Sequence, residues 1–440
     1  MSKESVVPRR EATQGSSEPA SWTWVDRSIW TDRMLAALGN GVQGNRWFSM
    51  IDKVYRPSTL EAAWQDVRRN RGAAGVDGQS IERFEARASH YLDELSEALR
   101  SGSYRPQGIR RIEIPKGDGR TRPLGIPVVK DRIVQAAVKR VIEPIFEHEF
   151  LPMSYGFRPG RGCKDALREV EVLLKEGYTH VVDADLEGYF DRIEHDRLME
   201  RVGKRLSDGR VLSLLRSWLG QEVIQGMERW TPTGGTPQGA IISPLLANVY
   251  LHPLDEEMTR RGYRMVRYAD DMVILCRSEE EARDALRVLQ GWVEANGLAL
   301  HPDKTHVGDC REKGQGFEFL GYRFEAGRRW VRKKSLKAIK EKIRNKTRRT
   351  SGRSLSCVIE DLNPMLRGWF QYFQHAHQWT FKPIDQMIRR RLRAMLRKQE
   401  KRPGMGRCQA DHARWPNRYF ADAGLFTLFE AWHFASQSRC

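Results

Sequence analysis

Apolar residues recur at helical spacing along much of the chain, and this periodicity predicts most of its secondary structure. Between Trp47 and Val67 the apolar positions lie three or four residues apart, which is typical of helices with one buried face. The same spacing predicts further amphipathic helices over 80–100, 132–146 and 163–176. Two apolar runs between 104 and 130 flank a glycine-containing turn at 116–120, which predicts a strand, a turn and a second strand.

The pattern changes at both ends of the chain. Residues 1–45 are polar and show no period, so we predict that most of them form a mobile tail. Alternating strands and helices continue to about residue 324. After residue 328 the pattern indicates only helices, and apolar stripes around 336–343, 362–373 and 384–396 predict three that pack together. We therefore expect an α+β body followed by an all-helical module.

The charge of the chain is concentrated in that helical module. The 440 residues contain 75 Lys and Arg against 57 Asp and Glu, a net charge of +18. Residues 328–402 alone contain 23 basic and 5 acidic residues, so the rest of the chain is neutral on balance. A solubilising face is the plain alternative, but this density favours a surface that binds a polyanion such as nucleic acid.

Composition also excludes several classes of protein. No run of 18 or more apolar residues is present, which argues against a membrane-spanning helix. The first residues lack the apolar segment of a secretory signal. The six cysteines are scattered without a CxxC pair, which argues against a zinc module and a disulfide framework. We expect a cytoplasmic protein, associated with the nucleoid when it acts on DNA.

Three short segments contain the unusual chemistry. An apolar, strand-like run over 180–193 delivers Asp183 and Asp185. A glycine- and proline-rich loop at 233–243 leads into a helix at about Pro244. Two apolar strands over 265–276 flank Asp270 and Asp271, which predicts a tight hairpin with carboxylates at its tip.

Adjacent aspartates between strands are most often a solvated turn, because aspartate is a favoured turn residue. A third carboxylate at the end of another strand changes that balance. Three converging carboxylates make an oxygen-ligand site that suits Mg²⁺ together with substrate phosphates. Two such ions can align an attacking hydroxyl with a leaving pyrophosphate, which is the main requirement of phosphoryl transfer.

These segments resemble the palm motifs of reverse transcriptases. The resemblance rests on DLEGYF at 185–190, TPQGAIISPLLANVYL at 236–251 and YADD at 268–271. More closely, the chain resembles bacterial group II intron-encoded proteins, in which one chain is both reverse transcriptase and splicing maturase. The supporting segments are NRGAAGVDG at 70–78, PLGIPVVKDRIVQAAV at 123–138, SYGFRPGRG at 154–162, LALHPDKTH at 298–306, FEFLGYRF at 317–324, LNPMLRGWFQYF at 362–373 and WPNRYFADAGLF at 415–426.

The resemblance implies a metal site for two Mg²⁺ ions. Asp185 and Asp270 would be the principal ligands of both ions, and the backbone carbonyl of Leu186 would be a further ligand. Asp271 would complete the site. The three aspartates are thus the expected catalytic residues.

The resemblance also implies contacts to the incoming dNTP. Phe190 would be an aromatic gate at the sugar, with a core aromatic as the alternative, and Gln238 would contact the sugar, with a loop-stabilising amide as the alternative. Lys116 and Arg122 would clamp the triphosphate unless they are plain surface charges on a hairpin. Lys304 would protonate the leaving pyrophosphate, or it is a structural or solvated lysine.

Further residues would contact template, primer or RNA. Arg158 in GFRPG is a candidate template contact or part of a rigid turn, and Tyr268 would support the primer terminus or is a buried strand aromatic. Within the basic module the expected RNA contacts are four lysines: Lys333, Lys334, Lys337 and Lys340.

The resemblance implies a right-hand reverse transcriptase fold, with fingers and palm followed by an α-helical thumb or maturase (X) domain. We divide the chain into a tail, an N-terminal extension, fingers and palm, the basic thumb, and a short region that resembles the family's DNA-binding segment: 1–45, 46–100, 101–327, 328–403 and 404–440. We expect no endonuclease domain, because paired cysteines and the necessary length are missing.

We expect an RNA-directed DNA polymerase that also binds its parent group II intron RNA to assist splicing and supports mobility by target-primed reverse transcription. Its expected partners are that RNA, a template–primer duplex, target DNA and dNTPs, with no membrane. Two alternatives remain open. One is a domesticated reverse transcriptase used in defence or DNA repair, and the other is a maturase that only assists splicing.

Overall fold

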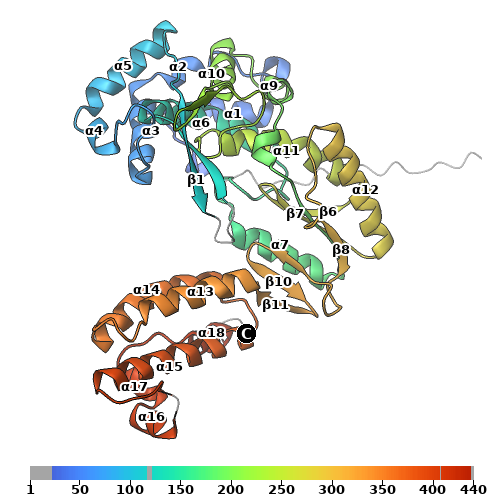
Figure 1. Cartoon of the computed structure of the whole chain (residues 1–440). Helices are drawn as coiled ribbons and strands as arrows, with labels where there is room; N and C mark the ends of the chain where they lie inside the picture. Colours follow the sequence, from blue (N-terminus) through green and yellow to red (C-terminus); the bar gives the residue numbers. More distant parts are fainter. Residues whose placement is uncertain (1–21, 116–120, 407, 438–440) are drawn as a thin grey trace, which may run out of the picture. The chain divides into compact units, whose positions relative to one another are not determined.

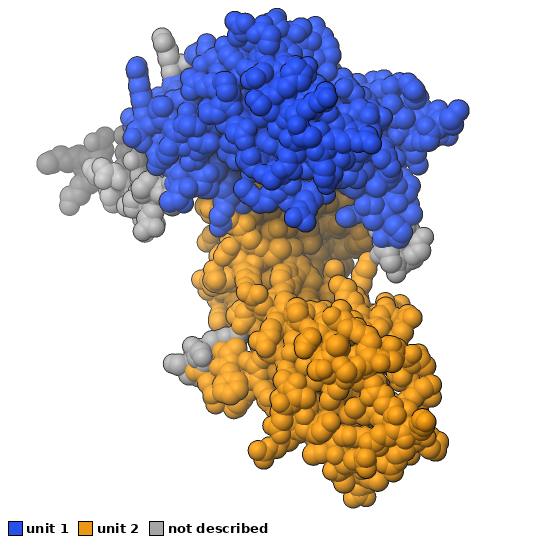
Figure 2. All heavy atoms as spheres, turned by 90° about the vertical axis from the view of Figure 1, so that its left-hand side faces the viewer, with its two compact units in different colours: residues 1–150, 158–160, 193–250 blue, residues 151–157, 161–192, 251–440 orange. Residues whose placement is uncertain are grey.

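The computed structural model describes residues 22–115, 121–406 and 408–437. The chain divides into two compact units, which Figure 2 distinguishes by colour. Unit 1 comprises residues 1–150, 158–160 and 193–250. Unit 2 comprises residues 151–157, 161–192 and 251–440. The predicted linear domains stay a prediction, since each unit is assembled from several separate stretches of chain.

Unit 1 is mostly helical with one small mixed sheet. Its helices are α1 (Asp32–Asn40), α2 (Ile51–Val54), α3 (Pro57–Asn70), α4 (Ile81–Glu85), α5 (Ala88–Ser101), α6 (Val129–Glu149), α9 (His195–Gly203), α10 (Gly209–Leu219) and the first part of α11 (Ser243–Arg260). Its strands are β1 (Ile109–Pro115), β2 (Thr121–Ile126), β4 (Val223–Gln225) and β5 (Glu228–Trp230), in the order β2-β1-β4-β5. The predicted strand–turn–strand is therefore present, although its turn lies outside the described residues.

Helix α6 forms the core of unit 1, and it is not the amphipathic helix that its sequence suggested. Four of its polar residues are buried together with its apolar ones, and Asp131 is almost completely inaccessible. The Asp131 carboxylate accepts hydrogen bonds from the Tyr104 hydroxyl at 2.7 Å and the Gln107 amide at 2.9 Å. Arg132 donates to the Pro127 carbonyl at 2.9 Å. These buried groups are tolerated because each satisfies backbone or side-chain partners in the surrounding loops.

The prediction of a mobile tail through residue 45 is wrong for its second part. Trp30 is fully buried, and its indole nitrogen donates to the Val141 carbonyl on α6 at 3.2 Å. Its ring also packs against Trp47 with the centroids 5.1 Å apart. A few large aromatic residues therefore order this segment despite its polar composition.

Unit 2 contains a four-stranded antiparallel sheet with the order β6-β7-β3-β8. Its strands are β3 (His180–Asp185), β6 (Arg264–Tyr268), β7 (Asp271–Cys276) and β8 (His306–Asp309). Helices α7 (Cys163–Lys175) and α12 (Glu279–Ala295) pack against this sheet. Unit 2 also contains the rest of α11 and the one-turn helix α8 (Tyr189–Arg192). The predicted helices near 163–176 and from about Pro244 are thus confirmed.

A second sheet leads from the first sheet of unit 2 to the helical module. It consists of β9 (Phe317–Phe319), β10 (Tyr322–Glu325) and β11 (Arg328–Val331). The module itself has α13 (Lys333–Lys346), α14 (Leu355–Phe373), α15 (Lys382–Gln399), α16 (Gln409–Arg414), α17 (Asn417–Asp422) and α18 (Leu428–Gln437). Helices α13, α14 and α15 pack together, as the three apolar stripes predicted (Figure 1).

One apolar core joins the second sheet of unit 2 to the three helices. It includes Phe317, Tyr322, Ile343, Leu366 and Leu392, all of which are nearly inaccessible.

Within the described residues, no helix is both long and apolar enough to cross a membrane.

Candidate active site and its supporting network

The strand pairing of unit 2 brings the predicted aspartates to one end of its four-stranded sheet. Asp185 at the end of β3 lies directly opposite Asp271 at the start of β7. Because side chains alternate along a strand, Asp183 lies on the same face as Asp185. On that face the pairing continues into the apolar pair Val181 and Leu275. The face is therefore acidic at one end and apolar at the other.

The predicted hairpin is present between β6 and β7. Tyr268 pairs with Asp271, and the two residues between them make the turn. Ala269 has a φ of 59°, an uncommon left-handed conformation for a residue with a side chain. This turn places Asp270 at the tip beside Asp271, as the sequence predicted.

The backbone after Asp185 is held by the segment that follows α12. The Asp185 carbonyl accepts a hydrogen bond from the His301 amide at 2.8 Å, and the Glu187 amide donates to the Ala299 carbonyl at 2.8 Å. These two bonds form the bridge between Leu186 and Leu300 and do not use the Leu186 carbonyl. That carbonyl is the group expected as a metal ligand.

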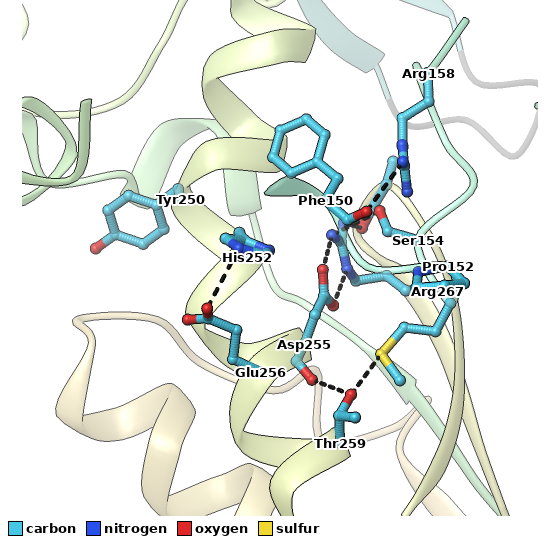
Figure 3. Close-up of polar contacts among 12 residues, drawn as sticks. Phe150, Pro152, Ser154, Arg158, Tyr250, His252, Asp255, Glu256, Thr259 and Arg267 are labelled. Atoms are coloured by element: carbon cyan, nitrogen blue, oxygen red, sulfur yellow. Dashed lines mark hydrogen bonds and ion pairs between the residues drawn. The ribbon is translucent and has the colours of Figure 1, made fainter. Parts of the chain in front are cut away.

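A buried ion pair between Arg267 and Asp255, drawn in Figure 3, supports the hairpin. Arg267 on β6 and Asp255 on α11 both have fully inaccessible side chains, and the guanidinium donates to both carboxylate oxygens at 2.7 and 2.5 Å. Arg267 also donates to the Ala269 carbonyl at 2.9 Å and to the Ser154 hydroxyl at 2.8 Å. The strained turn residue before Asp270 is thus fixed to a buried charge pair.

The SYGF segment at 154–157 forms a second support for the hairpin. The Tyr155 amide donates to the Arg267 carbonyl at 2.9 Å, and the Arg267 amide donates to the Met153 carbonyl at 2.9 Å. A β-carbon at Gly156 would clash with the backbone nitrogen of Ala269. Only glycine therefore allows this loop to lie against the turn that presents the aspartates.

The carboxylates disfavour one another's ionisation. Burial, together with Asp183, Asp185 and Asp270, raises the pKa of Asp271 to about 7. Burial also raises the pKa of Asp183 to about 6, and burial and Asp185 raise the pKa of Asp270. Clustered acids with shifted pKa values are typical of functional sites, and a cation among them would relieve the repulsion.

This repulsion predicts that the metal-free protein loses stability as the pH rises from acidic to neutral values, whereas an ordinary paired carboxylate would add stability. The folded state holds a proton on Asp271 between the ordinary pKa of 3.8 and about 7, so stability is greatest below this window and falls as pH rises through it. We expect Asp271→Asn to raise the free energy of unfolding by about 1–3 kcal/mol near pH 8 and by clearly less near pH 5, where only part of the repulsion has developed. Urea unfolding in EDTA at both pH values measures this. An unchanged pH profile in the variant would refute the assigned repulsion.

The donor set fits a divalent cation, although the side chains do not form a closed ligand shell. Among the described residues, no group of three or more His, Cys, Asp or Glu side chains is arranged to hold a metal ion. The ammonium group of Lys304 lies 2.5 Å from an Asp185 carboxylate oxygen. The available ligands are carboxylate and carbonyl oxygens only, which is the preference of Mg²⁺.

Other predicted nucleotide contacts lie in both units. Phe190 on α8 is half-buried in unit 2, and its ring meets Phe157 edge-on with centroids 6.4 Å apart. Gln238 lies in unit 1, where its backbone carbonyl accepts a hydrogen bond from the Gly125 amide of β2 at 2.7 Å. Arg122 is exposed on β2, and Lys116 lies outside the described residues. Lys304 is held by Asp185, a contact compatible with both of its alternatives.

Arg158 requires a correction, because its side chain is not available to a template. The side chain is 3% exposed and makes a bidentate ion pair with Glu147, with contacts between 2.7 and 3.0 Å. It also donates to the Phe150 carbonyl at 3.2 Å (Figure 3). The structure therefore favours the rigid-turn alternative for GFRPG.

The remaining predicted residues lie in unit 2. Tyr268 is half-buried against the core of unit 2, where burial and Cys163 raise its pKa to about 12. On α13, Lys333, Lys334 and Lys337 are exposed and Lys340 is half-buried. The α13 face opposite these lysines contains the buried Ile339 and Ile343.

Sequence reasoning missed three residues around the hairpin. Asp183 was visible as the alternate partner of Asp185 on one strand face but received no role. Its carboxylate lies 4.0 Å from the His306 ring and accepts from the Glu318 amide at 3.4 Å. Arg267 and Asp255 gave a weaker signal, namely an arginine within an apolar strand, which must find a buried partner.

Comparison with known proteins agrees with this geometry. The model of the reverse transcriptase (RNA-dependent DNA polymerase) family matches residues 114–324, and that of the group II intron maturase-specific domain matches residues 336–415. Protein YkfC of Escherichia coli is 33% identical over 349 residues, which cover 69% of this chain and 86% of YkfC. The group II intron-encoded protein LtrA of Lactococcus lactis is 34% identical over 204 residues, which cover 46% of this chain and 33% of LtrA.

Among solved structures, a chain of a partial Cas6-RT-Cas1–Cas2 complex is 26% identical, with coverage of 56% of this chain and 41% of that one and a TM-score of 0.36. The structure has the mixed helix and strand content of the expected α+β class, and the two family matches follow one another in the expected order. A reverse transcriptase domain is a polymerase that depends on a divalent metal, and the maturase domain indicates RNA as a partner. The chain therefore belongs to the family of group II intron-encoded proteins, in which a reverse transcriptase domain is followed by a maturase domain.

Proposed function

We propose that the chain copies RNA into DNA at Asp185, Asp270 and Asp271 with two Mg²⁺ ions. The observation that carries this proposal is the register of β3 and β7, which sets Asp185 opposite Asp271 while the hairpin presents Asp270 beside them. When bound, the ions would neutralise the triphosphate and align the primer hydroxyl with the α-phosphate. The three carboxylates and the Leu186 carbonyl would hold them. Primer extension on an RNA template tests the proposal.

Further residues of the chain would select the dNTP. Phe190 would lie where a ribonucleotide 2′-hydroxyl would be placed, and Gln238 would contact the sugar. Arg122 and Lys116 would bind the triphosphate, since its several negative charges favour charge-assisted hydrogen bonds from cationic side chains. Lys304, which pairs with Asp185 in the described structure, would turn to the leaving pyrophosphate once the ions neutralise the aspartates.

Phe190→Val is expected to raise the use of ribonucleotides relative to dNTPs by about 10- to 100-fold. A smaller side chain removes the steric conflict with the 2′-hydroxyl, and a conflict of this kind is worth about 1–3 kcal/mol. Single-nucleotide insertion with dCTP and CTP measures the ratio of kcat/KM. Phe434→Val, on an exposed aromatic of α18, is the matched control. Unchanged discrimination in Phe190→Val would remove the assignment.

We also propose that the helical module binds the parent intron RNA and stabilises its active fold. The support is the basic surface of α13 above a buried apolar stripe, together with the maturase family match. RNA itself would perform the splicing chemistry. Sequencing RNA that copurifies with the protein tests this: one structured intron supports the maturase role, and a random pool contradicts it.

Replacing Lys333, Lys334, Lys337 and Lys340 together by glutamine should weaken RNA binding and its dependence on salt. Each lost phosphate contact lowers the slope of log K against log salt by about 0.7–0.9, so four contacts lower it by about three. Filter binding at several salt concentrations measures the slope. The control replaces Arg283 and Arg287, which are exposed on α12 and already paired with acidic neighbours. Equal losses in both variants would contradict a specific role for α13.

Reverse transcription primed at a DNA target would make the chain part of a mobile intron. In that role target DNA is a further partner, and the cytoplasm with its nucleoid is the expected location. A domesticated polymerase in defence or repair remains the alternative function. It predicts polymerase activity without a cognate intron among the copurified RNAs.

A further inference from the structure

A pocket of about 430 Å³ lies in unit 2, away from the aspartates. Its walls come from α7, the loop before β3, the segment after β8, the β10–β11 hairpin, the segment after α14 and helix α18. Thr179 of the lining precedes β3, whereas Asp185 ends that strand. Since a strand rises about 3.3 Å per residue, the pocket is about 20 Å from the proposed metal site. It is therefore a separate site.

Three rings that line the pocket are fixed by contacts to neighbouring groups. The Trp432 indole donates to the Ala376 carbonyl at 3.1 Å. The His377 ring packs against Trp330 with centroids 4.7 Å apart, and Phe324 stacks on Phe317 at 4.9 Å. Rings that are already immobilised offer an apolar, flat-sided surface with little further loss of entropy when a planar group enters.

The charges of the pocket leave a cation in excess. Both lining carboxylates are occupied: Glu171 pairs with Arg329 at 2.6 Å, and Glu325 pairs with Arg323 at 2.6 Å. Arg311 is likewise paired with Asp309 at 2.6 Å. Arg328 is exposed at the pocket and has no hydrogen-bond or ion-pair partner in the described parts of the chain. The pocket therefore combines rings with an unpaired guanidinium, which suits a phosphate beside a planar base.

The nearby histidine has the matching chemistry for a base. Burial and the charge of Arg328 lower the pKa of His377, so its imidazole is neutral at physiological pH. Its Nδ1 accepts a hydrogen bond from the Trp379 amide at 3.4 Å, which leaves the Nε2 hydrogen to donate to a base. The volume of the pocket lies in the range of about 300–1,000 Å³ that is typical of small-ligand sites.

We propose that this pocket binds one unpaired nucleotide of a bound RNA, with the base against Trp432 and His377 and the phosphate on Arg328. The inference rests on the proposed RNA-binding function and adds to it a contact that recognises unpaired nucleotides. Structured RNAs are read mainly at loops and bulges, whose bases can leave the stack and bind aromatic side chains. The basic face of α13 carries no such information, because it binds phosphates of any sequence.

The test compares two labelled RNAs, a hairpin with an unpaired loop and a blunt duplex with the same stem. We expect Arg328→Gln and Trp432→Ala each to weaken hairpin binding by about tenfold, the range of one stacked base, and to leave duplex binding unchanged. Arg328 is exposed, so its variant keeps the fold even where Trp432→Ala does not. Arg390→Gln, on the exposed face of α15, should weaken both RNAs slightly and equally.

Two results would overturn the proposal. Equal loss for hairpin and duplex would reduce Arg328 to a general phosphate contact. The same chemistry would also suit a free nucleotide, and AMP is the probe for that case. If AMP binds tightly, Arg328→Gln abolishes its binding and hairpin binding is unchanged, the pocket belongs to a free nucleotide. Loss of all RNA binding by the unaltered chain would instead contradict the proposed maturase function, so the two failures can be told apart.

Discussion

Asp270→Asn should lower the rate of nucleotide addition by at least about a thousandfold, which corresponds to about 4 kcal/mol of lost transition-state stabilisation. The amide removes a negative charge from the hairpin tip, where the proposed ions need it to balance their own charge. Binding of template and primer should not change, since phosphate contacts elsewhere provide it. Single-turnover addition of one dNTP to a primer on an RNA template measures the effect.

The fold of this variant should be intact, because the charge that it removes is repulsive. Burial and Asp185 raise the pKa of Asp270, so its ionised form destabilises the folded state in the absence of metal. The melting temperature should therefore stay equal or rise. Asp303→Asn is the matched control, since Asp303 is an exposed carboxylate next to Lys304. Full activity of Asp270→Asn, or the same loss in the control, would contradict the assigned metal site.

Asp255→Ala should have the largest effect on stability, a loss of about 3–5 kcal/mol in the free energy of unfolding. The substitution leaves the Arg267 guanidinium buried without its counter-charge, because both side chains are fully inaccessible. Urea unfolding followed by circular dichroism measures the loss. Glu279→Ala is the control: its partner Arg283 is 72% exposed, and breaking such a surface pair costs about 0.5 kcal/mol.

The double variant Asp255→Leu with Arg267→Met separates stability from positioning. Apolar residues of similar volume commonly replace a buried ion pair without a loss of stability, so this variant should recover most of it. The hydrogen bond from Arg267 to the Ala269 carbonyl is still lost, and the hairpin tip loses its anchor. We expect a lower kcat with an almost unchanged KM. Recovery of full activity together with stability would show that the pair serves the fold alone.

Local chemistry was the part of this protein that its sequence predicted well. The hairpin at Asp270 and the helix from about Pro244 follow from strand alternation and from the preference of proline for a first helical turn, and both are present. The helices of the basic module follow from their apolar stripes. These features depend on residues close together in the chain, which is why their pattern is sufficient.

Features that depend on distant partners were not predictable in this way. Helix α6 reads as amphipathic, yet Asp131 and Arg132 are buried because distant residues, Tyr104 and Gln107 for the first and Ala73 for the second, supply hydrogen bonds. Trp30 orders a polar segment only because its ring packs against Trp47 and its indole nitrogen donates to α6. Arg158 looked like a template contact because its partner, Glu147, could not be recognised before the fold was known.

Primer extension by the unaltered chain on a defined RNA template, with dNTPs and Mg²⁺, tests the central claim most directly. The proposed function predicts DNA products that reach the end of the RNA template, and none in EDTA. A folded protein that binds the RNA but extends no primer would contradict the polymerase assignment and leave the maturase role alone.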